Sequence, residues 1–179
     1  FGRNVWLDVT RSAGLDFTEF ESMLRYEQTY THRLLDAICD VLDRPRGDFM
    51  EDIGTFLVSY PGFEAVRRLL RFGGEDFVDF LHSLDDLSDS VQLALPALKL
   101  PKVELLVISE NQFTLLCDPK IEGYGFVLMG VMRAMADDYG TLALFEHQGL
   151  QGDVEAVSIT LVEEHFAEGR SFDLAASFG

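Results

Sequence analysis

The chain has 179 residues, of which 47% are hydrophobic and 25% are charged, and this is enough for one globular domain with its own core. Its 31 acidic residues outnumber 14 basic ones and give a net charge of -17, so the surface repels nucleic-acid phosphates and anionic membranes. No apolar run approaches the roughly 20 residues that a membrane-spanning helix needs. We therefore expect a cytoplasmic protein that binds neither nucleic acid nor membranes.

The first third of the chain reads as helical. Residues 4–13 predict a short helix that carries Trp6 and that Gly14 closes. A second helical pattern runs from about Thr18 to Arg44. Its inward stripe consists of Tyr30, Leu34, Ile38 and Val41.

Two shorter helices are predicted after a break at residues 44–47. Asp48 is a suitable N-cap for a helix over 49–60. The residues expected to face inward on it are Ile53, Phe56, Leu57 and Tyr60. Pro61-Gly62 ends this helix, and a helix over 63–71 follows. The basic residues of its outer face are Arg67, Arg68 and Arg71.

The stretch from Phe77 to Leu95 predicts one long helix, opened by Glu75 or Asp76 and ended by Pro96. Its buried face consists of Phe77, Phe80, Leu81, Leu84, Leu87, Val91 and Leu95. Ser88 lies on this same face, where the pattern alone predicts a large apolar residue. The opposite, solvated face carries His82, Asp85, Asp86 and Asp89, with His82 spaced to pair with either of the first two acids.

Beyond Pro101 the pattern changes to strands. Residues 103–108 and 112–117 predict a hairpin. A helix follows over 122–139, in which Gly130 and Ala134 permit close approach of another element. A second strand pair, 141–146 and 154–162, surrounds a loop at 148–153.

This order of elements indicates an α+β fold. We expect an N-terminal helical lobe, then a lobe with a four-stranded antiparallel sheet and one long helix. The predicted boundaries are a single domain over 1–165 and a C-terminal tail or linker over 166–179.

Chemical motifs are scarce. No nucleophile elbow, phosphate-binding loop or dinucleotide fingerprint occurs, and no two histidines have metal-binding spacing. Cys39 and Cys117 are expected to be free thiols in a reducing compartment, although their spacing does not exclude a disulfide. Asp137 and Asp138 are expected to solvate the end of their helix. The sequence therefore favours a protein that is not an enzyme.

Three stretches resemble the haem nitric-oxide/oxygen-binding (H-NOX) sensor family, which includes the sensor domain of soluble guanylate cyclase. They are NVWLDVTRSAGL, LRYEQTYTHRLLDAICDVLDRPRGDFMEDIGTFLVSY and FVDFLHSLDDLSDSV with ALPALKLP. The resemblance covers about residues 1–165. It implies the α+β fold above, a haem cofactor, and a first helix that precedes Phe1.

Two departures from the family's pattern concern the haem. The family's LDxLH pattern supplies the histidine that ligates iron, and here Ser88 stands at that position. The family's YxSxR motif clamps the haem propionates, and the corresponding residues are Cys117 to Ile121, with Lys120 as the only cation. His82 lies about 240° around the helix from Ser88 and points elsewhere. We therefore expect that haem is no longer bound in the family's way.

The resemblance also implies which residues surround the family's ligand pocket. These positions are Leu57, Tyr60, Leu84, Ser88, Cys117, Val127 and Val131. They are expected to form either a filled core or an apolar cavity for another ligand.

Three hypotheses follow. The first is a regulatory domain without haem that acts through a partner, such as a histidine kinase or a cyclic-nucleotide enzyme, as the resemblance implies. The second is a haem-binding NO/O2 gas sensor with an unusual iron ligand such as Cys117 or His32. The third, an enzyme of another class on this fold, ranks last because no nucleophile or base stands out.

Overall fold

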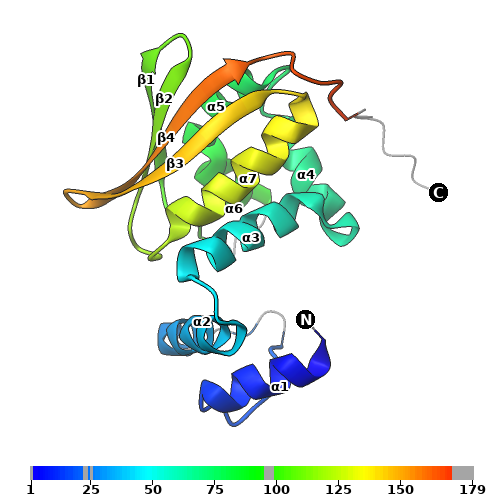
Figure 1. Ribbon diagram of the computed structural model, residues 1–179, viewed down its shortest axis with the longest axis vertical. Coiled ribbons are helices and arrows are strands. Elements are labelled where there is room, and N and C mark those ends of the chain that lie inside the picture. Colours follow the sequence, from blue (N-terminus) through cyan, green and yellow to red (C-terminus); the bar gives the residue numbers. More distant parts are fainter. Residues whose placement is uncertain (1, 22–23, 25, 95–98, 171–179) are drawn as a thin grey trace. The chain divides into compact units, whose positions relative to one another are not determined.

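The computed structural model describes residues 2–21, 24, 26–94 and 99–170 (Figure 1). The chain forms two compact units, residues 1–49 and 50–179. The single domain over 1–165 stays a prediction. Among the residues that the structure describes, every helix is too short or too polar to cross a membrane.

The first unit contains α1 (Arg3–Ser12) and α2 (Gln28–Leu42). They pack around a small core of Val9, Ala13 and Ala37, with Trp6 and Leu34 beside it. The helix predicted from about Thr18 to Arg44 is confirmed over Gln28–Leu42, but its predicted start is wrong, because the described residues between Thr18 and Glu27 are not helical. The indole Nε1 of Trp6 donates a hydrogen bond to the Thr18 carbonyl at 2.7 Å and holds this segment as a loop.

The helices α3 (Arg46–Ser59), α4 (Glu64–Arg71), α5 (Phe77–Ser83), α6 (Leu87–Ala94) and α7 (Tyr124–Tyr139) follow. The 3₁₀ helices are η1 (Pro61–Phe63) and η2 (Leu84–Asp86). α3 begins at Arg46, so Asp48 lies in its first turn and does not cap it. Asp76 is the N-cap of α5 as expected, because its carboxylate accepts from the Asp79 amide at 2.8 Å.

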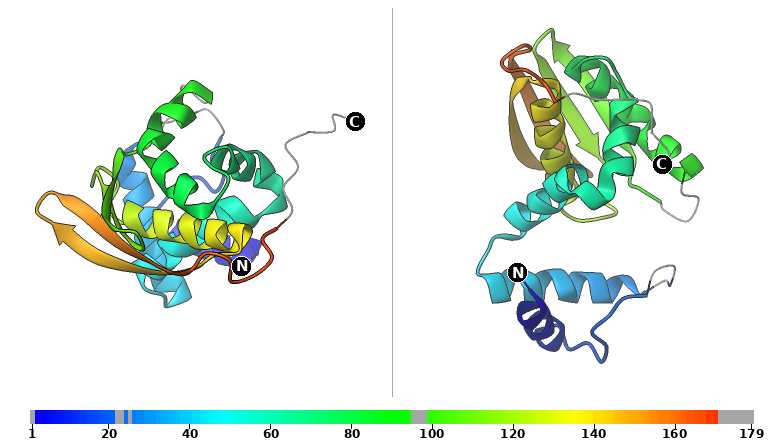
Figure 2. Two further views of the ribbon diagram at one scale, coloured as in Figure 1. Left: turned by 90° about the horizontal axis from the view of Figure 1, so that it is seen from above. Right: turned by 90° about the vertical axis from the view of Figure 1, so that its right-hand side faces the viewer.

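Four antiparallel strands form one sheet in the order β1-β2-β4-β3, which confirms the predicted α+β fold (Figures 1 and 2). They are β1 (Val103–Ser109), β2 (Gln112–Cys117), β3 (Leu142–Gln151) and β4 (Val154–Glu163). α7 lies across one face, and the core between them includes Leu115, Val157, Ile159, Met132 and Met135. The predicted loop at 148–153 is mostly strand, because Gly149 adopts a φ of 73° and β3 continues through an irregular register to Gln151.

α3 and α7 cross with their backbones in direct contact. A Cβ on Gly54 would overlap the carbonyl oxygen of Val127, and one on Gly130 would overlap that of Glu51. Gly130 therefore permits the close approach that the sequence predicted. This crossing also corrects the inward face of α3, whose buried residues are Met50, Gly54 and Val58. Phe56 and Tyr60, predicted to face inward, are half-exposed and stack on one another.

Two of the three basic residues of α4, Arg67 and Arg71, contact α7, whereas Arg68 pairs with Glu64 of its own helix. Both carboxylate oxygens of Asp138 accept from Arg67, at 2.7 and 2.8 Å, and Asp138 is only 1% exposed. The Arg71 guanidinium lies 3.9 Å from the centre of the Tyr139 ring. The prediction of a solvated Asp138 is therefore wrong, because Arg67 binds its carboxylate. The prediction of a solvated basic face is wrong for Arg67 and for Arg71, which lies against the Tyr139 ring.

The predicted single helix over 77–95 is interrupted. η2 separates α5 from α6, and Leu95 lies outside the described residues. The predicted apolar face is nevertheless confirmed on both sides of this interruption, because Phe77, Phe80, Leu81, Leu84 and Val91 are buried and Leu87 packs against the core. Leu84 is fully buried, whereas Leu87 and Ser88 are half-buried.

Candidate functional site

The predicted pocket residues do not all come together. Leu84 and Cys117 are fully buried, and Val131 is buried with them in the main core of the second unit. Val127 packs against this core and is partly buried. Leu57 is half-buried, while Tyr60 is 49% exposed and lies on the aromatic surface beside Phe56.

Ser88, at the position of the expected iron ligand, makes a hydrogen bond to the backbone of the same chain. Its hydroxyl donates to the Leu100 carbonyl at 3.2 Å and joins α6 to the segment that leads into β1. The hydroxyl hydrogen therefore has a backbone acceptor. The side chain acts as a tie between two elements of the fold.

A second tie lies one turn earlier. Asp85 is exposed, as predicted, and its Oδ1 also accepts from the Leu105 amide of β1 at 2.6 Å. The 3₁₀ geometry of η2 turns this carboxylate toward the strand. The expected pairing of His82 with Asp85 or Asp86 is not seen in this described segment, where the exposed His82 ring lies edge-on to Phe113. Two hydrogen bonds thus fix η2 and α6 to this part of the chain: Asp85 bonds to β1, and Ser88 bonds to Leu100 in the segment before it.

The residues that correspond to the propionate clamp follow β2. Burial, and next the charge of Glu155, raises the pKa of Cys117 from 9.0 to about 12, so this thiol stays protonated at neutral pH. Lys120 pairs with Asp118 at 2.6 Å, and this bond lowers the pKa of the Asp118 carboxyl. The only cation of the segment therefore already has an acidic partner.

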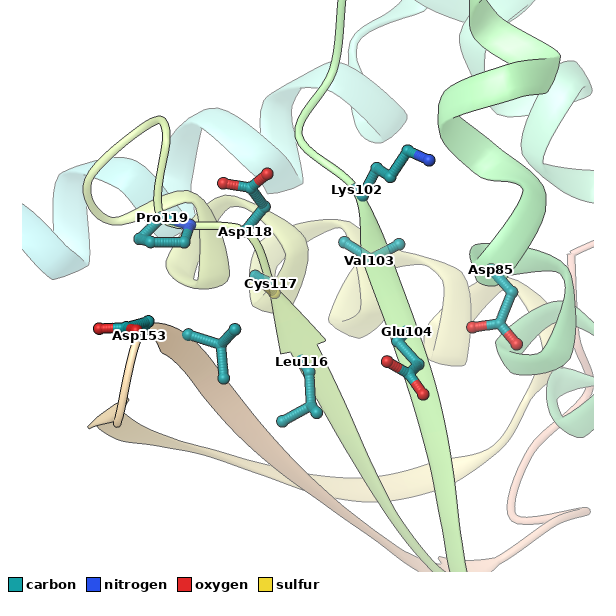
Figure 3. Close-up of a pocket in the computed structure, with 10 residues that line it drawn as sticks. Asp85, Lys102, Val103, Glu104, Leu116, Cys117, Asp118, Pro119 and Asp153 are labelled. Atoms are coloured by element: carbon teal, nitrogen blue, oxygen red, sulfur yellow. The ribbon is translucent and has the colours of Figure 1, made fainter.

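An open groove of about 520 Å³ lies at this end of the sheet (Figure 3). Its lining includes Lys102, just before β1, and Asp118, just after β2, whose amide donates to the Lys102 carbonyl at 2.9 Å. Figure 3 shows the Lys102 side chain pointing away from Asp118, with Asp153 at the turn before β4. The carboxylates that line the groove are those of Asp85, Glu104, Asp118 and Asp153, against the single ammonium group of Lys102. The groove therefore disfavours an anionic ligand.

Sequence reasoning missed a buried polar cluster at the N-terminus of α7. Glu155 is 4% exposed, and its two oxygens accept from the amides of Gly123 and Gly125 at 2.7 and 2.8 Å. The Nε2 atom of His147 lies 3.5 Å from Glu155 Oε2. The signal was present, because Glu155 interrupts an otherwise apolar inward alternation with Val157 and Ile159.

The remaining candidate iron ligands are His32 and the two cysteines. In the first unit, Nη2 of Arg46 lies 3.4 Å from Nδ1 of His32. Cys39 and Cys117 are both free thiols, as expected. Within the described ranges, no three histidine, cysteine or acidic side chains gather closely enough to hold a metal ion.

The amino-acid sequence is similar to a known family and to two curated proteins. The sequence matches the family model described as Haem-NO-binding over residues 1–147. It is 24% identical over 167 residues to soluble guanylate cyclase gcy-31 of Caenorhabditis elegans, and 24% identical over 143 residues to soluble guanylate cyclase 89Da of Drosophila melanogaster. These matches cover 93% and 78% of the chain but only 24% and 21% of the two relatives. The chain thus spans about a quarter of their length.

Solved structures show the same fold. The Fe(II) unliganded H-NOX protein from K. algicida has a TM-score of 0.73 at 16% identity, with 94% of this chain and 91% of that chain covered. The Fe(II)NO state of the H-NOX protein from S. oneidensis has a TM-score of 0.69 at 17% identity, with 89% of each chain covered. The similarity extends through the helices and the sheet.

Proposed function

Because the chain belongs to the haem-NO-binding (H-NOX) family, we propose that it is a regulatory domain of this fold that works without haem and acts through a partner protein. The observation that carries the proposal is Ser88, which stands where the family pattern has its iron-ligating histidine and bonds to the Leu100 carbonyl. A neutral hydroxyl is a poor iron ligand beside an imidazole. The helix needs no iron to hold it, since Asp85 and Ser88 already attach it to the chain around β1.

The charges around residues 117–121, which correspond to the family's propionate clamp, support the same proposal. A haem bears two propionate carboxylates, which need cations or hydrogen-bond donors to be held. Here the segment 117–121 offers only Lys120, which is paired with Asp118, and the neighbouring Glu155 adds a buried negative charge. These residues do not fit the carboxylates of haem.

The alternative, a haem sensor with Cys117 or His32 as its iron ligand, has less support. A cysteine binds iron as the thiolate, and burial raises the pKa of Cys117 to about 12. The Nδ1 atom of His32 lies beside the Arg46 guanidinium, whose positive charge opposes the approach of a metal ion. We therefore prefer the function without haem.

The proposed partner is a cyclic-nucleotide enzyme, with a histidine kinase as the other candidate. The two curated relatives are soluble guanylate cyclases, and the chain matches about a quarter of each. In this proposal the domain transmits binding of a partner or of an apolar ligand to the catalytic protein, and catalyses nothing itself.

Titration with hemin tests the proposal. We expect the purified chain to stay colourless when it is expressed with a haem precursor, and to show no stoichiometric Soret band with added hemin. Ser88→His should raise hemin affinity at least about tenfold over Ser90→His, a control at an exposed position of the same helix. A sharp Soret band near one haem per unmodified chain would overturn the proposal and direct mutation to Cys117 and His32.

A further inference from the structure

The N-terminus of α7 holds a carboxylate that the chain itself supplies. Glu155 lies at the start of β4, and its oxygens accept from the amides of Gly123 and Gly125 at 2.7 and 2.8 Å. α7 runs from Tyr124 to Tyr139, so its aligned peptide dipoles favour a negative charge at this end. The carboxylate is 4% exposed and therefore shielded from competing water.

His147 and Gly125 lie beside the Glu155 carboxylate. The Gly149 amide donates to Nδ1 of His147 at 3.1 Å, which assigns the ring proton to Nε2, the atom 3.5 Å from Glu155. That Nε2 is buried and has no hydrogen-bond partner in the described structure. A Cβ on Gly125 would come within 3.0 Å of both His147 and Glu155, so a larger residue there would require these two side chains to shift.

This carboxylate lies beside the residues that correspond to the propionate clamp. Glu155 is the direct cross-strand partner of Cys117, where that segment begins, and its two amide donors follow the segment's end. We propose that Glu155 acts as a built-in carboxylate that fills an anion-binding position at the N-terminus of α7 and keeps carboxylate-bearing ligands, haem included, from this end of the fold. The inference rests on the proposed function for its reference to haem.

Two consequences follow from the geometry. Two carboxylates do not share one set of amide donors, because their charges repel in a buried site. Removing Glu155 should therefore leave the amides of Gly123 and Gly125 without an acceptor and create a position for a small carboxylate from solution.

The test is rescue of Glu155→Ala by acetate. We expect this substitution to lower Tm by about 5–10 °C, because two buried amides lose their acceptor. Acetate at 100 mM should then restore about 3–5 °C relative to chloride at equal ionic strength, and should shift the amide signals of Gly123 and Gly125. Glu104→Ala, at an exposed acid of the same end of the sheet, and the unmodified protein should show no such difference.

Equal Tm values in acetate and chloride, with unchanged amide signals, would overturn the inference. If Glu155→Ala does not fold, the unmodified chain still decides, because its Gly123 and Gly125 amides should exchange with solvent as slowly as the interior of α7. Fast exchange of both would refute the role of Glu155. Rescue in a chain that nevertheless binds haem would overturn the proposed function and the exclusion of haem, but not the carboxylate position. Absence of rescue in a colourless chain would overturn only this inference.

Discussion

Replacing Asp138 should be among the most destabilising single changes in the second unit. The carboxylate is 1% exposed and both of its oxygens accept from Arg67, whose side chain is 19% exposed. Asp138→Ala leaves a largely buried guanidinium without its acceptor, which costs about 3–5 kcal/mol. Each kcal/mol shifts Tm by about 2–4 °C in a chain of this size, so Tm should fall by about 6–20 °C.

Chemical and thermal unfolding, followed by circular dichroism, measure this change. Asp137→Ala is the matched control, because Asp137 precedes Asp138 on the same helix but is exposed, and it should change stability by less than about 0.5 kcal/mol. The double variant Arg67→Met, Asp138→Leu should recover much of the loss, because the largely buried guanidinium is removed with its acceptor and the other partner of Asp138, Arg170, is exposed. If Asp138→Ala is as mild as Asp137→Ala, the reasoning about this ion pair is refuted.

Three further changes test other parts of the structure. Gly54→Ala should cost about 3 kcal/mol in urea unfolding, because the new methyl group overlaps the Val127 carbonyl; a neutral result would refute the backbone contact between α3 and α7. Burial raises the pKa of Cys117 from 9.0 to about 12 in the folded chain, so the unfolded chain loses the thiol proton at a lower pH. The free energy of unfolding should therefore fall between about pH 9 and 12, by up to about 1.4 kcal/mol per pH unit. Cys117→Ala should flatten that slope, and an unchanged profile would contradict the assignment. Ser88→Ala should cost about 1 kcal/mol, and no loss would show that the bond to Leu100 is dispensable.

Sequence patterns correctly predicted the features that depend on residues close together in the chain. The hairpin at 103–117 consists of two runs rich in β-forming residues on either side of a turn, and the structure has both strands there. Asp76 caps α5 through its own side chain, which is also a local interaction. The glycine at 130 marked a close approach before its partner was known.

The parts that failed depend on residues far apart in the sequence. Which face of α3 is buried follows from contact between Gly54 and α7, and periodicity within α3 does not contain that information. Arg67 seemed a surface charge until Asp138 was placed beside it. Glu155 could not be connected with Gly123 and Gly125 from sequence, because the connection requires the pairing of β4 with β2. Ser88 was identified as unusual, but its acceptor Leu100 was not.

The bond between Asp85 and Leu105 also bears on how this protein behaves at high concentration. β1 is an edge strand, and open edges allow strands of other molecules to add and build fibrous aggregates. The Asp85 carboxylate occupies an outward amide near the middle of β1. Beyond it remain only Leu106–Ser109, a stretch shorter than the usual strand of about 5–6 residues. One acidic side chain from η2 therefore protects the sheet against growth along this edge.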